Sequence, residues 1–137
     1  MAPQASHVFV IRDLAKSEAS DIEPFKLTED RLRIGRSLRA DIQVSGFDCS
    51  RIHATLVRER NEHGQFCYTL HDGDLSAGRS SANGTYVNGQ QISEHRLCNG
   101  DRILFGTQVE ATYWYVPVKT PPPLPETYGD TQTLSDT

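Results

Sequence analysis

Prolines are absent from the long central part of this chain and crowded after it. None occurs between Phe25 and Val116, whereas five of the seven fall within residues 117–125. Proline has no amide N–H to donate, so a sheet accepts it only at an edge, an end or a bulge. The chain has 137 residues, enough for one domain with a modest core. Its proline-free interior favours a sheet, and Pro117 marks the limit of that sheet.

Short runs of alternating apolar and polar residues fill this interior. They predict strands at residues 8–11, 25–28, 31–34, 41–44, 53–59, 66–70, 85–87, 101–105 and 109–116. Glycine and asparagine punctuate them, most clearly at the Asn-Gly pairs 88–89 and 99–100. Closely spaced strands without strand–helix alternation predict an all-β sandwich. We expect residues 13–23 and 71–84 to be connecting loops, and Trp114 to lie in the core.

The composition excludes several classes of protein. No run approaches the roughly 20 apolar residues that span a bilayer, and residues 1–6 contain neither a basic start nor an apolar signal core. The three cysteines are odd in number, widely spaced and outside any CxxC pattern. They predict reduced thiols in a cytoplasmic protein, without a metal site or a membrane.

The charge distribution points to a local anion site. The chain has a net charge of −4, yet residues 31–60 hold seven arginines and three acidic residues, a local charge of +4. A basic segment within an acidic chain favours a discrete anion site over a nucleic-acid surface. Aromatic and basic residues are not interleaved, as they are in many binders of single-stranded nucleic acid. The alternative for these arginines is that they are solvated side chains at strand edges.

Three short motifs lie where predicted strands meet turns. Gly35-Arg36 ends one strand, Ser50-Arg51 precedes another with His53 close behind, and Asn83-Gly84-Thr85 follows the long loop. Serine and arginine side chains both donate hydrogen bonds to phosphate oxygens. His53 lacks an accompanying nucleophile or carboxylate motif, which disfavours catalysis. Asp72 and Asp74 lack the rest of a calcium-loop pattern and are interpreted as turn residues.

The ordered set of motifs, completed by Val87-Asn88-Gly89, resembles the forkhead-associated (FHA) domain family over residues 6–116. The resemblance implies a β-sandwich of about eleven short strands that reads phosphothreonine peptides with loops at one end. It implies a binding module in signalling, not an enzyme, with no cofactor and with a phosphothreonine-containing protein as partner. A domain that keeps the sandwich but binds partners without phosphate is the alternative.

The resemblance also implies roles for individual residues. The phosphate would be bound by Arg36, Ser50 and Arg51, and the peptide backbone by Asn83. Gly35 and Gly84 would be positions where the backbone needs glycine, and His53 would be a brace between loops. The motif is completed by Thr85, Asn88 and Gly89, the last two mainly as a hairpin turn. Ala82 stands where the family often has threonine or serine, so a phosphate contact is lost unless Ser80 or Ser81 supplies it.

The ends of the chain are expected to lie outside the domain. Residues 1–5 are predicted to be a flexible N-terminus, and residues 117–137 a proline-rich spacer followed by an acidic, threonine-rich tail without fixed structure. Three tail threonines are candidate phosphorylation sites, Thr127, Thr131 and Thr133. Once phosphorylated, one of them could occupy the chain's own site or that of a neighbouring copy. The alternative is that the tail is a disordered linker without a role as a ligand.

Overall fold

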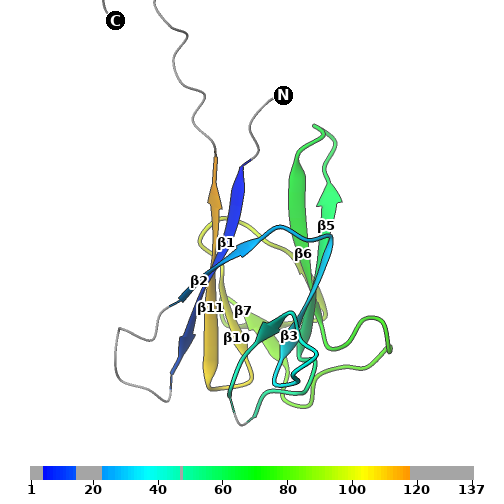
Figure 1. Ribbon diagram of the computed structural model, residues 1–137, viewed down its shortest axis with the longest axis vertical. Coiled ribbons are helices and arrows are strands. Elements are labelled where there is room, and N and C mark those ends of the chain that lie inside the picture. The colour runs from blue at the N-terminus through cyan, green and yellow to red at the C-terminus, as the bar shows by residue number, and fades with distance from the viewer. Residues whose placement is uncertain (1–4, 15–22, 47, 118–137) are drawn as a thin grey trace, which may run out of the picture.

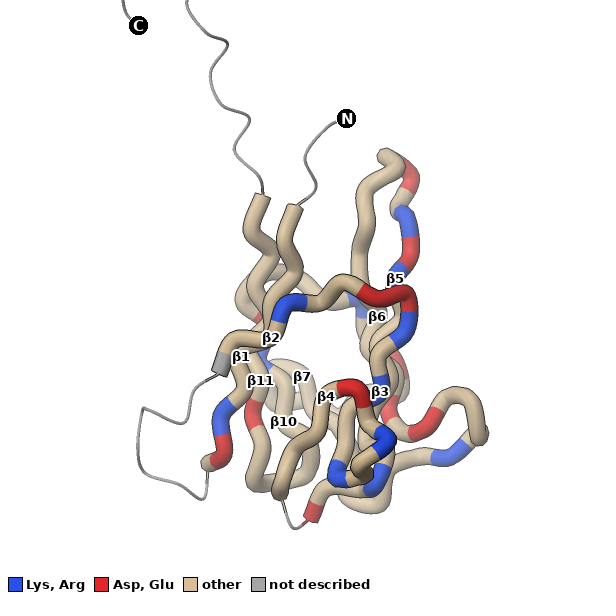
Figure 2. The backbone as a smooth tube through the Cα atoms, viewed as in Figure 1, with Lys and Arg blue, Asp and Glu red and all other residues tan. Residues whose placement is uncertain are grey.

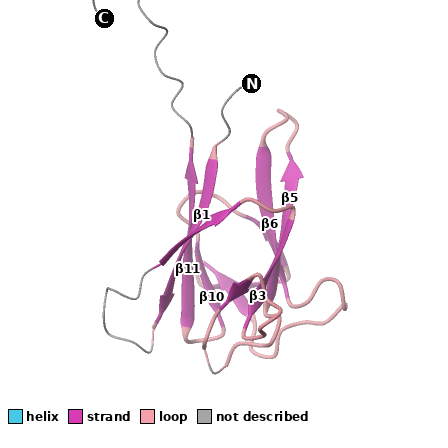
Figure 3. Ribbon diagram, viewed as in Figure 1, coloured by secondary structure: helices cyan, strands magenta, loops and turns pink. Residues whose placement is uncertain are grey.

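A computed structural model describes residues 5–14, 23–46 and 48–117 of the chain (Figure 1). The described residues form eleven strands: β1 (Ser6–Asp13), β2 (Glu23–Leu27), β3 (Arg31–Gly35), β4 (Ile42–Gln43), β5 (Ala54–Arg60), β6 (Phe66–Asp72), β7 (Thr85–Val87), β8 (Gln90–Ile92), β9 (Glu94–Arg96), β10 (Arg102–Phe105) and β11 (Val109–Val116). Figure 3 shows only strands and loops in the described part. The predicted all-β sandwich of about eleven strands is confirmed.

The strands form two sheets. One has the order β2-β1-β11-β10-β7-β8 and the other β4-β3-β5-β6-β9. The pairs are antiparallel except β3 with β4, where Ile34 lies opposite Ile42. In the pairing of β1 with β11, Ser6 lies opposite Val116, so the first and last strands enter and leave the fold side by side. Figure 1 places this pair of ends opposite the loops that follow β3 and β6.

The core lies between the two sheets. From the six-stranded sheet come fully buried residues such as Phe9, Ile103 and Phe105, and the five-stranded sheet contributes Leu56 and Tyr68. Burying side chains of this kind stabilises the fold by about 1.5–3 kcal/mol each. Their alternation with exposed neighbours is the pattern that predicts the strands from the sequence.

Trp114 lies outside the core, so the expectation that it is a core residue is wrong. Its side chain is 43% exposed, whereas Ala111 and Tyr113 on the same strand are buried. Successive side chains of a strand point to opposite faces. Trp114 therefore shares the outer face of β11 with Glu110 and Thr112.

Several local expectations are refined by the structure. The run at 41–44 is a strand only over β4, and β8 and β9 occupy residues for which no strand was predicted. The loop expected at 71–84 begins after Asp72, and within it Asp74 and Arg79 form an isolated β-bridge.

All three cysteines are free, and Cys49 is buried. Burial raises the pKa of its thiol to about 11, with a smaller contribution from the charge of Asp48.

The predictions for the chain ends lie outside the described residues. These are the expected flexibility of residues 1–4, most of the loop at 13–23, and the spacer and tail from residue 118 onward. Within the described ranges, no helix is long and apolar enough to cross a membrane.

Candidate functional site

Three loops meet at the end of the sandwich opposite the paired chain ends. The β3–β4 loop and the β4–β5 loop run side by side, because the Arg36 amide donates to the Ser50 carbonyl (3.2 Å) and the Ser37 amide to the Arg51 carbonyl (3.0 Å). The β6–β7 loop joins them, because the Ala82 amide donates to the Ser50 hydroxyl (2.8 Å). Figure 2 shows lysine and arginine positions gathered around β3 and β4 at this end.

Gly35 allows the first two loops to approach this closely. A Cβ atom placed on Gly35 would lie 1.9 Å from the carbonyl oxygen of Arg51, so any side chain would push the loops apart. Gly84 is needed for a different reason, since its φ of +88° lies in the left-handed region that other residues avoid. Both motif glycines are therefore explained by backbone geometry.

His53 lies fully buried between the loops. Its Nδ1 accepts a hydrogen bond from the Ser50 amide (3.0 Å), so Nε2 carries the proton and donates it to the Gly84 carbonyl (2.7 Å). Burial lowers the pKa of His53 and outweighs the Gly84 bond and the charges of Asp72 and Asp48, which raise it. The ring is therefore neutral near pH 7, with both nitrogens engaged in structure.

The three predicted phosphate ligands lie on the surface of this end. Arg36 and Arg51 are exposed, and Ser50 is half-buried between them and the β6–β7 loop. The Nε of Arg36 donates to the Cys49 carbonyl, which directs its guanidinium group along the loop. Among the described residues, the terminal nitrogens of Arg36 and the guanidinium group of Arg51 have no hydrogen-bond partner. The site thus presents two unpaired cations beside a hydroxyl that has accepted one bond and still has its proton to donate.

Asn83 is also exposed at this end. Its Nδ2 donates to the carbonyl oxygen of Asp48 (2.8 Å). Asp48 is itself fixed, because one carboxylate oxygen accepts bonds from the amide (2.7 Å) and the hydroxyl (2.5 Å) of Thr107. Burial acts to raise the pKa of Asp48, but the bonds from Thr107 bring it below its usual value. The amide oxygen of Asn83 remains able to accept a bond from a peptide N–H.

Asn88 and Gly89 lie away from this group. They form the β7–β8 turn, where Asn88 has a φ of +51° and Gly89 a φ of +87°. The Asn88 side chain donates to Asp101 (2.9 Å) and accepts from the Arg102 amide (3.0 Å) at the start of β10. Strand β7 separates this turn from the phosphate candidates, which agrees with its interpretation as a hairpin.

Sequence reasoning missed the role of Asp72 at the end of β6. Its carboxylate accepts hydrogen bonds from the Ser81 hydroxyl (2.5 Å), the Ser81 amide (3.1 Å) and the Thr85 hydroxyl (2.6 Å). Thr85, the third residue of the Asn83-Gly84-Thr85 motif, thus faces this carboxylate and not the surface. Asp72 lies two residues after a predicted strand, and no local sequence pattern identifies Ser81 and Thr85 as its partners.

Ser81 cannot replace the hydroxyl that Ala82 lacks. Besides donating to Asp72, the Ser81 hydroxyl accepts a hydrogen bond from the Gly84 amide (2.9 Å). Both of its functions are therefore engaged within the loop. Of the two serines suggested by the sequence, only the exposed Ser80 is without such contacts among the described residues.

Comparisons with known proteins identify a matching family and a related protein. The family model named FHA domain matches residues 32–106, more than half of the chain. An uncharacterized protein of Synechocystis sp., Sll1895, is 33% identical over 84 residues, which are 61% of this chain and 12% of that protein. The chain thus matches only a small part of that relative's length.

Solved structures agree with the fold. The crystal structure of the Slr1951 protein from Synechocystis sp. has a TM-score of 0.69 at 40% identity, covering 80% of this chain and 97% of that one. The yeast Dun1 FHA domain, solved in complex with a doubly phosphorylated (pT) peptide derived from Rad53, has a TM-score of 0.63 at 21% identity. That comparison covers 88% of this chain and 81% of the Dun1 chain, and it shows likeness of fold.

Proposed function

The chain belongs to the FHA domain family, and from this premise we propose that it is a phosphothreonine-peptide binding module that mediates phosphorylation-dependent protein interactions. The observation that carries the proposal is the pair of exposed guanidinium groups of Arg36 and Arg51 beside the Ser50 hydroxyl. A phosphate group carries roughly −1.5 to −2 charges near pH 7, and arginine offers it a planar fork of donors. The described site has the donors for such a group.

The peptide backbone would be read by Asn83. A side-chain amide can donate to and accept from main-chain groups, which suits recognition that is independent of the ligand's side chains. One of its two N–H groups is held by the Asp48 carbonyl, so we expect the second N–H to donate to a peptide carbonyl and the oxygen to accept a peptide N–H. This division of roles would place the phosphate between the β3–β4 and β4–β5 loops and the peptide chain along the β6–β7 loop.

A role in catalysis is not proposed for His53. Its Nδ1 accepts a hydrogen bond from the Ser50 amide and its Nε2–H donates one to the Gly84 carbonyl, so neither nitrogen is available to a substrate. A binding role also needs no cofactor. The partner we propose is a protein carrying phosphothreonine.

One observation favours the alternative, a domain that binds its partners without phosphate. Ala82 supplies no hydroxyl, and that of Ser81 is engaged with Asp72 and Gly84. The site therefore has fewer neutral donors for a phosphate than the family often has. The two arginines remain, and they supply the stronger, charge-assisted bonds, so we retain phosphate binding as the main proposal.

The test is a titration of the whole chain with a phosphothreonine peptide library and with the same library unphosphorylated. We expect binding only to the phosphorylated peptides, and loss of that binding in Arg51→Ala with an unchanged melting temperature. Equal affinity for both libraries would support the phosphate-independent alternative. Binding that survives Arg51→Ala and Arg36→Ala would contradict the assigned site.

A further inference from the structure

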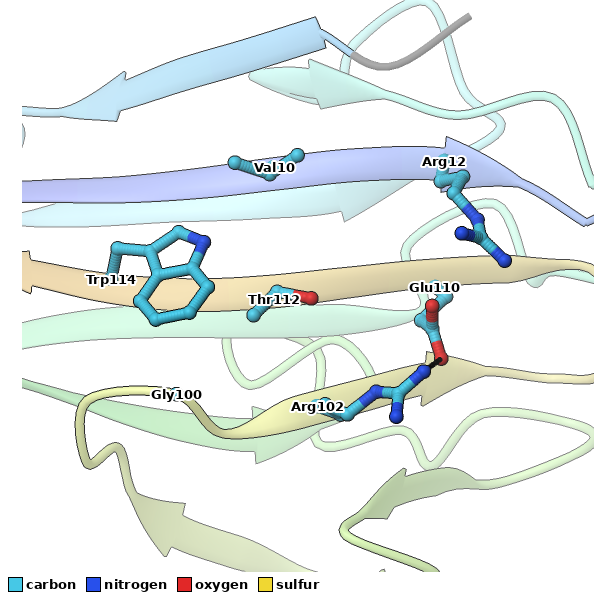
Figure 4. A pocket seen from close by; sticks show the side chains of 7 residues that line it. All are labelled: Val10, Arg12, Gly100, Arg102, Glu110, Thr112 and Trp114. Carbon is cyan, nitrogen blue, oxygen red and sulfur yellow. Dashed lines mark hydrogen bonds and ion pairs between the residues drawn. The ribbon is translucent and has the colours of Figure 1, made fainter. Parts of the chain in front are cut away.

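The outer face of the six-stranded sheet carries a hollow that the candidate phosphopeptide site does not use. It has a volume of about 320 Å³ and is formed by β1, β10, β11 and the turn before β10. Figure 4 shows Trp114 at one end, Val10 and Thr112 in the middle, and three charged side chains at the other end: Arg12, Glu110 and Arg102. We call this surface the Trp114 face.

The Trp114 face offers an apolar platform that is incompletely covered. The indole ring is 43% exposed, and Val10 and Thr112 beside it are half-buried. A tryptophan side chain stabilises a fold or an interface most when its large apolar ring is buried and its N–H still has a hydrogen-bond partner. An exposed indole next to branched aliphatic groups is thus a surface suited to a covering segment.

Cations lie at the edges of this platform. Arg102 pairs with Glu110 at 3.3 Å, and Arg12 lies opposite Glu110 in the pairing of β1 with β11. Lys26 lies in the same row as Trp114, two strands across the sheet. Three cations and one carboxylate give the face a local charge of +2, which favours an acidic occupant.

We propose that residues 118–137 of this same chain fold back and cover the Trp114 face. The segment begins one residue after the position that follows Val116, the end of β11, and its net charge is −2, from Lys119 against Glu126, Asp130 and Asp136. Four prolines lie at 121, 122, 123 and 125. Proline-rich segments dock on aromatic surfaces at little entropic cost, because their extended conformation is largely preformed.

The length of the segment suits this path. From Val116 back to the level of Glu110 is six residues of β11, about 20 Å at roughly 3.3 Å per residue. After a reversal of a few residues, a polyproline-type chain rising about 3.1 Å per residue covers that distance in about seven residues. The prolines would then lie beside Trp114 and Val10, and Glu126 and Asp130 beside Arg12. Tethering gives such a segment an effective concentration of about the millimolar range.

The experiment uses the full chain and its only tryptophan as the probe. We compare the wild type with a tail variant carrying Glu126→Gln, Asp130→Asn and Asp136→Asn, and with Arg12→Gln on the face. The readouts are the emission maximum, quenching by neutral acrylamide, and the single indole N–H resonance in NMR. We expect a red shift, stronger quenching and a moved indole resonance in both variants, and the same changes for the wild type in 1 M salt, where charge pairs are screened.

A matched control is Arg96→Gln, which removes an exposed arginine from β9 of the other sheet and should leave all three readouts unchanged. Unchanged readouts in the tail variant and in Arg12→Gln would overturn the proposal. So would protection of Trp114 that disappears on dilution, because it would assign the face to the tail of a second copy. None of these readouts involves a phosphopeptide, so the result is independent of the function proposed above.

Discussion

The Nε2 atom of His53 lies 2.7 Å from the carbonyl oxygen of Gly84, and this hydrogen bond joins the β4–β5 loop to the β6–β7 loop. Protonation of the ring would leave this bond in place but would remove the lone pair on Nδ1 that accepts a hydrogen bond from the Ser50 amide. The geometry of the candidate site is therefore coupled to the protonation of one buried side chain.

We predict that the protein loses stability as the pH falls below about 6.5, the usual pKa of histidine. Burial lowers the pKa of His53 and also that of His7, where the charge of Arg58 adds a smaller effect. In both cases the unfolded chain binds protons that the folded chain excludes. The free energy of unfolding should then fall by up to about 1.4 kcal/mol per pH unit for each group, until the lowered pKa is reached.

Urea denaturation at pH 7.5, 6.5 and 5.5 measures this effect. In His7→Gln the remaining dependence on pH belongs mainly to His53, and His63→Gln, in the exposed β5–β6 turn, serves as the control. A midpoint that does not change with pH in His7→Gln would show that protonation of His53 is not excluded by folding.

The second prediction concerns Arg36. Replacement by alanine should weaken phosphopeptide binding by about 1.5–3 kcal/mol, which is roughly 10- to 150-fold, because a charge-assisted hydrogen bond is lost. Arg96→Ala is the control, since it removes the same charge from β9. Calorimetric titration of both variants measures the difference, and equal affinities would remove Arg36 from the site.

Asp72 is predicted to hold the β6–β7 loop in its binding conformation. Asp72→Asn places a donor where an acceptor is needed for Ser81 or Thr85, and each lost charged bond costs about 1.5–3 kcal/mol. We expect a lower melting temperature and weaker phosphopeptide binding together. Among the described residues, the Asp74 carboxylate accepts a single long bond of 3.3 Å from the Ala77 amide, so Asp74→Asn should change both quantities much less. Similar losses in the two variants would contradict this role.

The fourth prediction is a gain of affinity. Ala82→Thr introduces a hydroxyl at an exposed position next to Asn83, without disturbing the Ala82 amide that donates to Ser50. One additional hydrogen bond to phosphate should improve binding by about 0.5–1.5 kcal/mol. Ala77→Thr, further back in the same loop, is the matched control. If Ala82→Thr binds no better than the control, the phosphate lies elsewhere.

The last prediction concerns the tail threonines, which lie outside the described residues. We propose that phosphorylated Thr131, or else Thr127 or Thr133, competes with an external phosphopeptide. The fourteen residues from Pro117 to Thr131 can extend over about 45 Å, comparable to the length of a small domain. Phosphorylation should weaken binding of the external peptide or increase the mass in solution, and the triple change to valine should abolish both effects. If phosphorylation alters neither quantity in the unmodified sequence, the tail is not a ligand of the site.

The sequence predicts the sheets better than the details of the site. Long alternating runs such as β5 and β11 are predictable because their periodicity reflects a buried and an exposed face. Strands β8 and β9 are short and polar, and their existence depends on pairing with β7 and β6, which a local pattern does not contain. Trp114 shows the same limit, since alternation specifies two faces but not which of them is buried.

The candidate site was predictable where the backbone geometry requires a particular residue type. Gly35 is such a position, because only glycine permits the close approach of the Arg51 carbonyl. The contacts of Asp72 were not predictable, since they join residues 9 and 13 positions apart through a loop of irregular conformation. The engagement of Ser81 likewise depends on a folded loop and not on spacing.

The pairing of Ser6 with Val116 has a consequence for how this fold can be joined to other proteins. Because the chain enters and leaves at neighbouring points, the domain could be spliced into a surface turn of a host protein without stretching that turn. The loops that carry Arg36, Ser50 and Asn83 would then project away from the junction (Figure 1). Because the junction and the binding loops lie at opposite ends of the domain, the loops could change their ligand without affecting the attachment to the host, and the host could change without affecting the loops.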